Sequence, residues 1–166
     1  IGRKEDLERA GIKVLKDLPG VGHNLQEHLD ILANFTCTKP ITMNAAATQI
    51  PLQIKTAFEY FVLNKGIAAC NMIEAGGFVK SSSDLAIPDI QLHFIPILMH
   101  GLIDPIPKQH GMSIHACQLR PQSRGSVLPG SADPFASPLV DFNFLDNEHD
   151  WKVIQRSYEI VRDIAQ

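Results

Sequence analysis

The sequence lacks the features that most quickly assign a chain to a class of protein. Its 166 residues include one Trp and three Cys, and the net charge is only −3. Since no basic stripe is present, nucleic acid is not an expected partner. No apolar run reaches the roughly 18–20 residues that a membrane helix needs. What remains is a globular composition, with 45% hydrophobic residues and enough length for a core.

The cysteines also give no indication of disulfide bonds. Cys37, Cys70 and Cys117 are far apart, and no C-x-x-C occurs. Such a set is typical of reduced thiols packed as small apolar residues. It favours a reducing compartment, either the cytoplasm or peripheral attachment at the inner face of the membrane. Because the chain begins at Ile1-Gly2 without a signal-like segment, we expect it to be a piece of a larger protein.

A complete dinucleotide-binding motif is also missing. The run Gly20-Val21-Gly22-His23-Asn24-Leu25 matches the first half of G-x-G-x-x-G but has Leu25 at the third glycine position. It follows a proline and precedes an expected strand rather than a helix. Phosphate binding at a helix N-terminus is therefore not predicted here. We interpret the run as a loop that connects two domains.

Alternation of apolar and polar residues predicts several strands. Residues 29–38 place Ile31 and Phe35 on one face and Asp30 and Asn34 on the other. Four further strands are predicted at residues 75–80, 90–97, 112–119 and 125–128, with a turn at residues 121–124 joining the last two. These strands are grouped along the chain. This grouping favours an α+β fold with an antiparallel sheet of about five to six strands flanked by helices.

Helical periodicity appears in three places. Residues 4–10 form a short helical pattern that Gly11 ends. Residues 51–64 have apolar positions at helical spacing. A third helix begins near Glu148, where Asp146 or Asn147 can cap it. Its predicted buried stripe consists of Trp151, Ile154, Tyr158 and Val161.

Four segments of the chain carry motifs that occur together, in this order, in one enzyme family. They are Ile1-Gly2 with Leu7-x-x-x-Gly11-Ile12, the run 18–28, Glu74–Phe78 preceded by Asn71, and Ser123–Val127 followed by Asp133-Pro134 and Pro138–Phe144. These segments resemble the glucose–methanol–choline (GMC) oxidoreductases, in the branch of the choline and medium-chain alcohol dehydrogenases, although the family usually has Asp-His where this chain has Glu27-His28. The resemblance covers almost the whole chain.

The resemblance implies a two-domain, FAD-dependent enzyme of which this chain is a central piece. Residues 1–28 would be the tail of the FAD-binding part and a linker. Residues 29–166 would be the substrate-binding domain, with the C-terminal region of the family beginning near residue 123. The family's catalytic histidine lies downstream of this chain. We therefore expect no catalytic residue here, no FAD bound to the chain alone and no activity of the chain alone.

Asp30 is the first candidate substrate-binding residue. The resemblance aligns it with a Glu that attracts the trimethylammonium group in choline-oxidising members. A carboxylate near a buried ligand suits a cation, but Asp is one methylene shorter. The alternative is a solvated or capping aspartate.

His93 is the second candidate. Alternation places it with Gln91 and Ile95, opposite Ile90, Leu92 and Phe94. By resemblance it matches a histidine that hydrogen-bonds the alcohol oxygen, and a neutral imidazole can also steady a developing alkoxide. The alternative is a structural histidine in the sheet.

Glu74 and Asn71 are weaker candidates for the same pocket. The glycines after Glu74 permit close backbone approach to a ligand, but a strand entry and a turn are the alternative roles.

Other polar residues offer less support for a site. His23 and His28 lack a third ligand for a metal, and no metal is expected. His115 and Cys117 share a strand face, but nothing in the sequence activates a nucleophile. Arg120 and Arg124 are interpreted as flanking a solvated hairpin.

The expected parent protein oxidises a primary alcohol to an aldehyde by hydride transfer to flavin, as a dehydrogenase rather than an oxidase, with a quinone as a possible electron acceptor. Asp30 and the apolar composition favour an aliphatic or aromatic alcohol over choline, which is the alternative substrate. A stand-alone ligand-binding module without catalysis is the second alternative. Partners would be the alcohol and the missing FAD-binding domain, and a sheet face without its partner domain would allow self-association.

Overall fold

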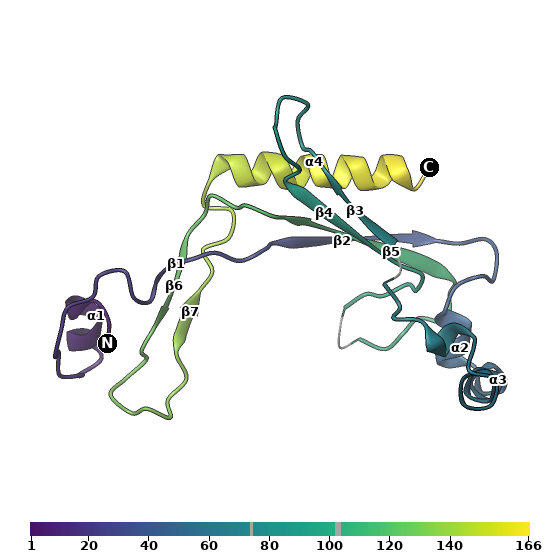
Figure 1. Cartoon of the computed structure of the whole chain (residues 1–166), viewed down its shortest axis with the longest axis horizontal. Helices are drawn as coiled ribbons and strands as arrows, with labels where there is room; N and C mark the ends of the chain where they lie inside the picture. Colours follow the sequence, from purple (N-terminus) through teal and green to yellow (C-terminus); the bar gives the residue numbers. More distant parts are fainter. Residues whose placement is uncertain (74, 102–103) are drawn as a thin grey trace. The chain divides into compact units, whose positions relative to one another are not determined.

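The structure is a computed structural model that describes residues 1–73, 75–101 and 104–166 (Figure 1). Contacts between Cα atoms divide it into two units. The first contains residues 1–29 and 120–152, and the second contains residues 30–119 and 153–166. No helix in the described part of the chain is both long and apolar enough to cross a membrane.

The second unit is built on a four-stranded antiparallel sheet with the order β2-β5-β4-β3. Its strands are β2 (Asp30–Thr36), β3 (Ala75–Val79), β4 (Ile90–Ile95) and β5 (Gly111–Gln118). All four lie within or near the ranges predicted from alternation. The period of two is clear in these segments because one face carries the apolar core and the other carries mostly polar side chains.

The buried face of this sheet packs against α4 (Glu148–Ile164), whose residues from 153 onward belong to this unit. Its core consists of buried apolar side chains from three strands and the helix. They are Ala33, Ile90, Leu92, Ile114, Ala116, Val153 and Val161.

The predicted stripe of α4 was partly wrong. Ile154 and Val161 are buried, but Trp151 and Tyr158 are 50% and 54% exposed. Val153 and Ser157 are buried instead, and Ser157 Oγ donates to Val153 O at 2.8 Å. The helix thus turns its small and β-branched residues to the sheet, since these permit close approach, and leaves the bulky aromatics outside.

Two helices follow β2 in the second unit, α2 (Asn44–Thr48) and α3 (Ile50–Phe61), and the short 3-10 helix η1 (Ile67–Ala69) precedes β3. Buried Asn44 connects α2 to the segment after β4: its side chain accepts from Leu98 N–H (2.9 Å) and donates to the carbonyls of Leu98 and Pro107. Helix α3 begins with Pro at its first turn, as predicted, but none of its residues is buried. Its apolar positions, such as Phe58 and Phe61, are therefore exposed.

The first unit contains a three-stranded antiparallel sheet with the order β1-β6-β7. Its strands are β1 (His23–Leu25), β6 (Gly125–Leu128) and β7 (Leu139–Asp141). The strands predicted as one sheet are thus divided between two. The predicted hairpin at residues 121–124 was wrong, because β5 and β6 belong to different sheets. Arg124 instead donates to the carbonyls of Pro121 and Ser123 and to Asn24 Oδ1.

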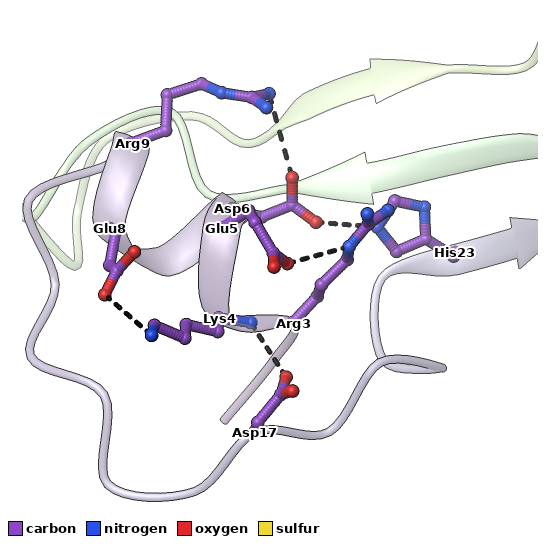
Figure 2. Close-up of polar contacts among 8 residues, drawn as sticks. All are labelled: Arg3, Lys4, Glu5, Asp6, Glu8, Arg9, Asp17 and His23. Atoms are coloured by element: carbon purple, nitrogen blue, oxygen red, sulfur yellow. Dashed lines mark hydrogen bonds and ion pairs between the residues drawn. The ribbon is translucent and has the colours of Figure 1, made fainter.

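Helix α1 (Lys4–Arg9) is connected to β1 by a hydrogen bond between side chains (Figure 2). Asp6, 8% exposed, contacts His23 Nε2 at 2.6 Å and Arg9 Nη1 at 3.7 Å. The hydrogen bond from His23 lowers the pKa of Asp6, aided by the charges of His23 and Arg9, while burial opposes the shift. Lys4 N–H also donates to Asp17 Oδ1 at 2.9 Å, which holds the loop after α1.

The start of α4 is organised by two side chains of the first unit. Asn147 caps the helix, as one of the two predicted candidates, by accepting from His149 N–H at 2.8 Å. Asp150, 1% exposed, accepts from Gln122 N–H (2.8 Å), Ser123 N–H (2.8 Å) and Ser123 Oγ (2.6 Å). The segment that leads into β6 is therefore held by a carboxylate on the helix.

We predict that Asp150→Ala destabilises the chain by about 3 kcal/mol, because buried donors lose their acceptor. Urea unfolding followed by circular dichroism measures the change. Glu148→Ala is the matched control, since its pair with Lys152 is 81% and 70% exposed and its removal should barely move the midpoint. Equal effects of the two substitutions would contradict this role of Asp150.

We also predict that the stability contributed by Asp6 depends on pH. Because its pKa is lowered in the folded state, ionised Asp6 stabilises the fold above the ordinary carboxyl pKa. That contribution is lost as pH falls through the lowered value. The difference in the free energy of unfolding between the wild-type chain and Asp6→Asn, measured with urea, should be present near neutral pH. It should disappear in acid. Glu8→Gln, which removes an exposed partner 3.9 Å from Lys4, is the control, and a difference constant with pH would refute the prediction.

Candidate functional site

Alternation along the four-stranded sheet gathers polar side chains on the face opposite the core. Residues that are paired across an antiparallel sheet point to the same side. The pairs Asp30↔Cys117↔Gln91, Asn34↔Ser113 and His93↔His115 therefore share one face. We call this set the polar face: Asp30, Asn34, Gln91, His93, Ser113, His115 and Cys117.

The register of β4 and β5 places two histidines side by side. His93 lies directly opposite His115, and Gly76 of β3 lies opposite His93 on the other side. A Cβ at Gly76 would sit 2.5 Å from Leu92 O, so only glycine permits this approach of β3 to β4. Directly opposed residues have Cβ atoms roughly 5 Å apart, so the two imidazoles are close neighbours on this face.

Asp30 is joined to His115 by a short contact between Asp30 Oδ2 and His115 Nδ1. A carboxylate only accepts hydrogen bonds, so His115 donates through Nδ1. Asp30 remains 41% exposed, whereas the imidazole is 19% exposed. His115 Nε2 is buried and has no hydrogen-bond partner among the described residues.

This pair was missed in the sequence because its members are 85 residues apart. Alternation alone placed both side chains on polar faces of their strands. Only the register of β2 with β5, in which Asp30 lies opposite Cys117, brings Asp30 diagonally next to His115.

Cys117 does not have the environment of a nucleophile. Burial raises the pKa of its thiol, and the negative charge of Asp30 raises it further. A thiol shifted in this direction is less ionised at neutral pH and less reactive. Since His115 Nδ1 is engaged by Asp30, the structure argues against a His115–Cys117 dyad.

The other end of the polar face is closed by its own hydrogen bonds. Ser113 Oγ lies 2.7 Å from Asn34 Oδ1 and 2.8 Å from Ile97 O, and it accepts from Met99 N–H at 3.2 Å. Asn34 Nδ2 donates to Met99 O at 2.6 Å. The part of the polar face with capacity for a ligand is therefore the end that carries Asp30, His93 and His115.

The remaining predicted residues lie elsewhere. Asn71 is exposed in the segment between η1 and β3, outside the polar face. Glu74 lies outside the described residues. His23 is paired with Asp6 rather than available as a metal ligand. Within the described ranges, no three His, Cys, Asp or Glu side chains form a group suited to a metal ion.

The glycine run does not fit a phosphate site for FAD. Gly22 has a φ of +82°, and a Cβ there would lie 2.7 Å from Val127 O. The glycine thus permits close approach to β6, whose Val127 N–H donates to Gly22 O at 2.8 Å. The run leads into β1 and not into a helix. The described residues therefore offer no helix N-terminus to a pyrophosphate at this run.

Comparisons with known proteins found matches to a family profile, to curated proteins and to solved structures. Residues 121–166 match the profile of the GMC oxidoreductase family. The chain is 38% identical over 164 residues to the oxygen-dependent choline dehydrogenase of Klebsiella pneumoniae subsp. pneumoniae, and this alignment covers 99% of the chain. It covers 29% of that protein, so the chain spans less than a third of the length of such relatives.

Two solved structures share the fold. Formate oxidase from Aspergillus oryzae RIB40 aligns with a TM-score of 0.83 and 23% identity, over 98% of this chain and 33% of that one. Pyridoxine 4-oxidase from Mesorbium loti aligns with a TM-score of 0.74 and 22% identity, over 100% of this chain and 29% of that one. The predicted α+β class with antiparallel pairing is confirmed. The chain thus resembles GMC oxidoreductases, through the profile match of residues 121–166.

Proposed function

We propose that this chain forms the substrate-binding wall of an FAD-dependent oxidoreductase that converts a primary alcohol to an aldehyde. The polar face carries the proposal: Asp30 and two adjacent histidines lie on the sheet face that α4 leaves uncovered. A wall of this kind binds and orients an alcohol, while bound FAD would supply the hydride acceptor. Residues 1–28 would belong to the flavin-binding side and residues 29–166 to the substrate side.

His93 would hydrogen-bond the alcohol oxygen. His93 is partly exposed on the polar face, and a neutral imidazole hydrogen-bonds a hydroxyl and stabilises charge that develops on its oxygen. Asp30 lies on the same face and would contact the far end of the substrate. No residue of this chain is assigned as the acceptor of the hydroxyl proton. In this proposal the chain binds and orients the substrate, and the chemistry is completed by the rest of the parent protein.

Choline is the second candidate substrate. The curated relatives from Klebsiella and Acinetobacter are named oxygen-dependent choline dehydrogenases, and Asp30 presents a half-exposed carboxylate on the polar face. A carboxylate favours a quaternary ammonium group by Coulomb attraction. Neutral aliphatic and aromatic primary alcohols remain our first candidates, because the shorter Asp side chain reaches less far toward such a group.

In the full-length protein, His93→Ala should lower kcat/KM for a primary alcohol by about 100-fold, since the imidazole would stabilise charge on the oxygen in the transition state. Flavin reduction measured anaerobically in a stopped-flow instrument provides the rate. His100→Ala, which removes an exposed histidine outside the polar face, should leave the rate unchanged. Failure of every primary alcohol to reduce the flavin would overturn the proposed function.

The isolated chain should purify without FAD, because its glycine run does not form a phosphate site. Absorbance near the flavin band and mass spectrometry under native conditions test this directly. Stoichiometric FAD on the isolated chain would contradict this prediction.

A further inference from the structure

We propose that helix α3 binds the surface of an anionic phospholipid membrane, with its axis in the plane of the headgroups and its apolar side inserted between them. This surface does not include the residues of the polar face. The side chains that would enter the membrane form what we call the α3 stripe: Ile50, Ile54, Phe58, Phe61 and Val62.

Helix α3 is amphipathic, but it is turned the opposite way from a helix that packs on a core. Its partly buried side carries Leu52, Thr56 and Glu59, whose spacings of four and three residues place them on one side. The α3 stripe also has helical spacing and lies on the opposite side. Its five side chains are between 55% and 78% exposed. An apolar side left largely uncovered in this way is typical of an interaction site.

Contacts within the second unit hold α3 in this orientation. The helix packs chiefly beside α2 and η1 (Figure 1), and Gln53 Nε2 donates to Ala47 O of α2 at 2.9 Å. The turn after the helix lies against its polar side, because a Cβ at Gly66 would be 2.9 Å from Glu59 Oε2. Lys65 N–H also donates to Glu59 O at 3.0 Å. The rotation of α3 is thus fixed by its polar side, and the α3 stripe is left outside.

The charges near the α3 stripe favour an anionic lipid over a neutral one. The charged side chains between residues 39 and 65 are Lys39, Lys55, Glu59 and Lys65. All three lysines are exposed, and Lys55 Nζ lies 3.7 Å from Glu59 Oε1. Since the whole chain has a net charge of −3, this segment is a cationic part of an acidic chain. Lysines beside an inserted apolar side attract anionic headgroups.

An aromatic pair suits the depth at which such a helix would lie. Tyr60 is exposed and contacts Phe61 edge to face, with ring centroids 5.0 Å apart. A tyrosine ring with its polar hydroxyl is favoured at the level of the headgroups, whereas phenylalanine is favoured below them. The pair therefore matches the boundary between headgroups and acyl chains.

The test measures co-sedimentation of the full-length protein with vesicles of phosphatidylcholine, made with or without phosphatidylglycerol. The wild type should bind the vesicles that contain phosphatidylglycerol on the order of tenfold more tightly, and this difference should shrink at high salt. Phe58→Ser combined with Phe61→Ser should weaken binding to both kinds of vesicle by about tenfold or more, because inserted apolar area is lost. Phe135→Ser removes a 95% exposed phenylalanine of the first unit and is the matched control without effect.

The contribution of charge is tested separately. Lys55→Gln combined with Lys65→Gln should remove most of the preference for phosphatidylglycerol and leave the weaker binding to phosphatidylcholine unchanged. Lys13→Gln combined with Lys16→Gln removes the same charge from exposed positions of the first unit, and it should keep the preference.

Circular dichroism should show that every variant is folded, since all the substituted side chains are exposed. Equal vesicle binding by the wild type and the double phenylalanine variant would overturn the proposal. A dimer in sedimentation velocity that this variant dissociates, without vesicle binding by the wild type, would also overturn it and would assign the α3 stripe to a contact between two copies.

Discussion

The register between β4 and β5 is the constraint on which the rest of the candidate site depends. It sets Leu92 opposite Ala116 on one face and His93 opposite His115 on the other. Because side chains alternate strictly along a strand, a slip of one residue would exchange the two faces. The apolar residues would then meet solvent and the histidines would meet α4. Packing of the core and placement of the polar face are thus determined together.

This coupling explains what the sequence predicted well. Strands β2, β4 and β5 were found because a helix seals one face, which imposes a period of two on their residues. The start of α4 near Glu148 was predicted with Asp146 or Asn147 as its cap, and Asn147 caps it. Its buried stripe was predicted only in part, because helical spacing alone did not exclude Trp151 and Tyr158. In the structure, the close approach of helix and sheet selects Val153 and Ser157 instead. Strands β1 and β7 have three residues each, too few for a period to be recognised.

The candidate site, like the fold, was predicted from the sequence only in part. Asp30 and His93 were proposed from their positions on polar strand faces and from resemblance to GMC oxidoreductases. The partner of Asp30 depends on strand order and register, which the local pattern does not contain. His115 was therefore interpreted as structural, although it is the residue that contacts Asp30. The glycines at 20 and 22 looked like part of a phosphate motif, yet Gly22 serves the close packing of β1 on β6.

The central claim is that the substrate meets this chain on the polar face of the four-stranded sheet. A crystal structure of the full-length protein with a bound, unreactive alcohol analogue tests it most directly. The account predicts the hydroxyl within hydrogen-bond distance of His93 and the remainder of the ligand beside Asp30. An analogue bound elsewhere, for example against α4 on the opposite side of the sheet, would contradict it.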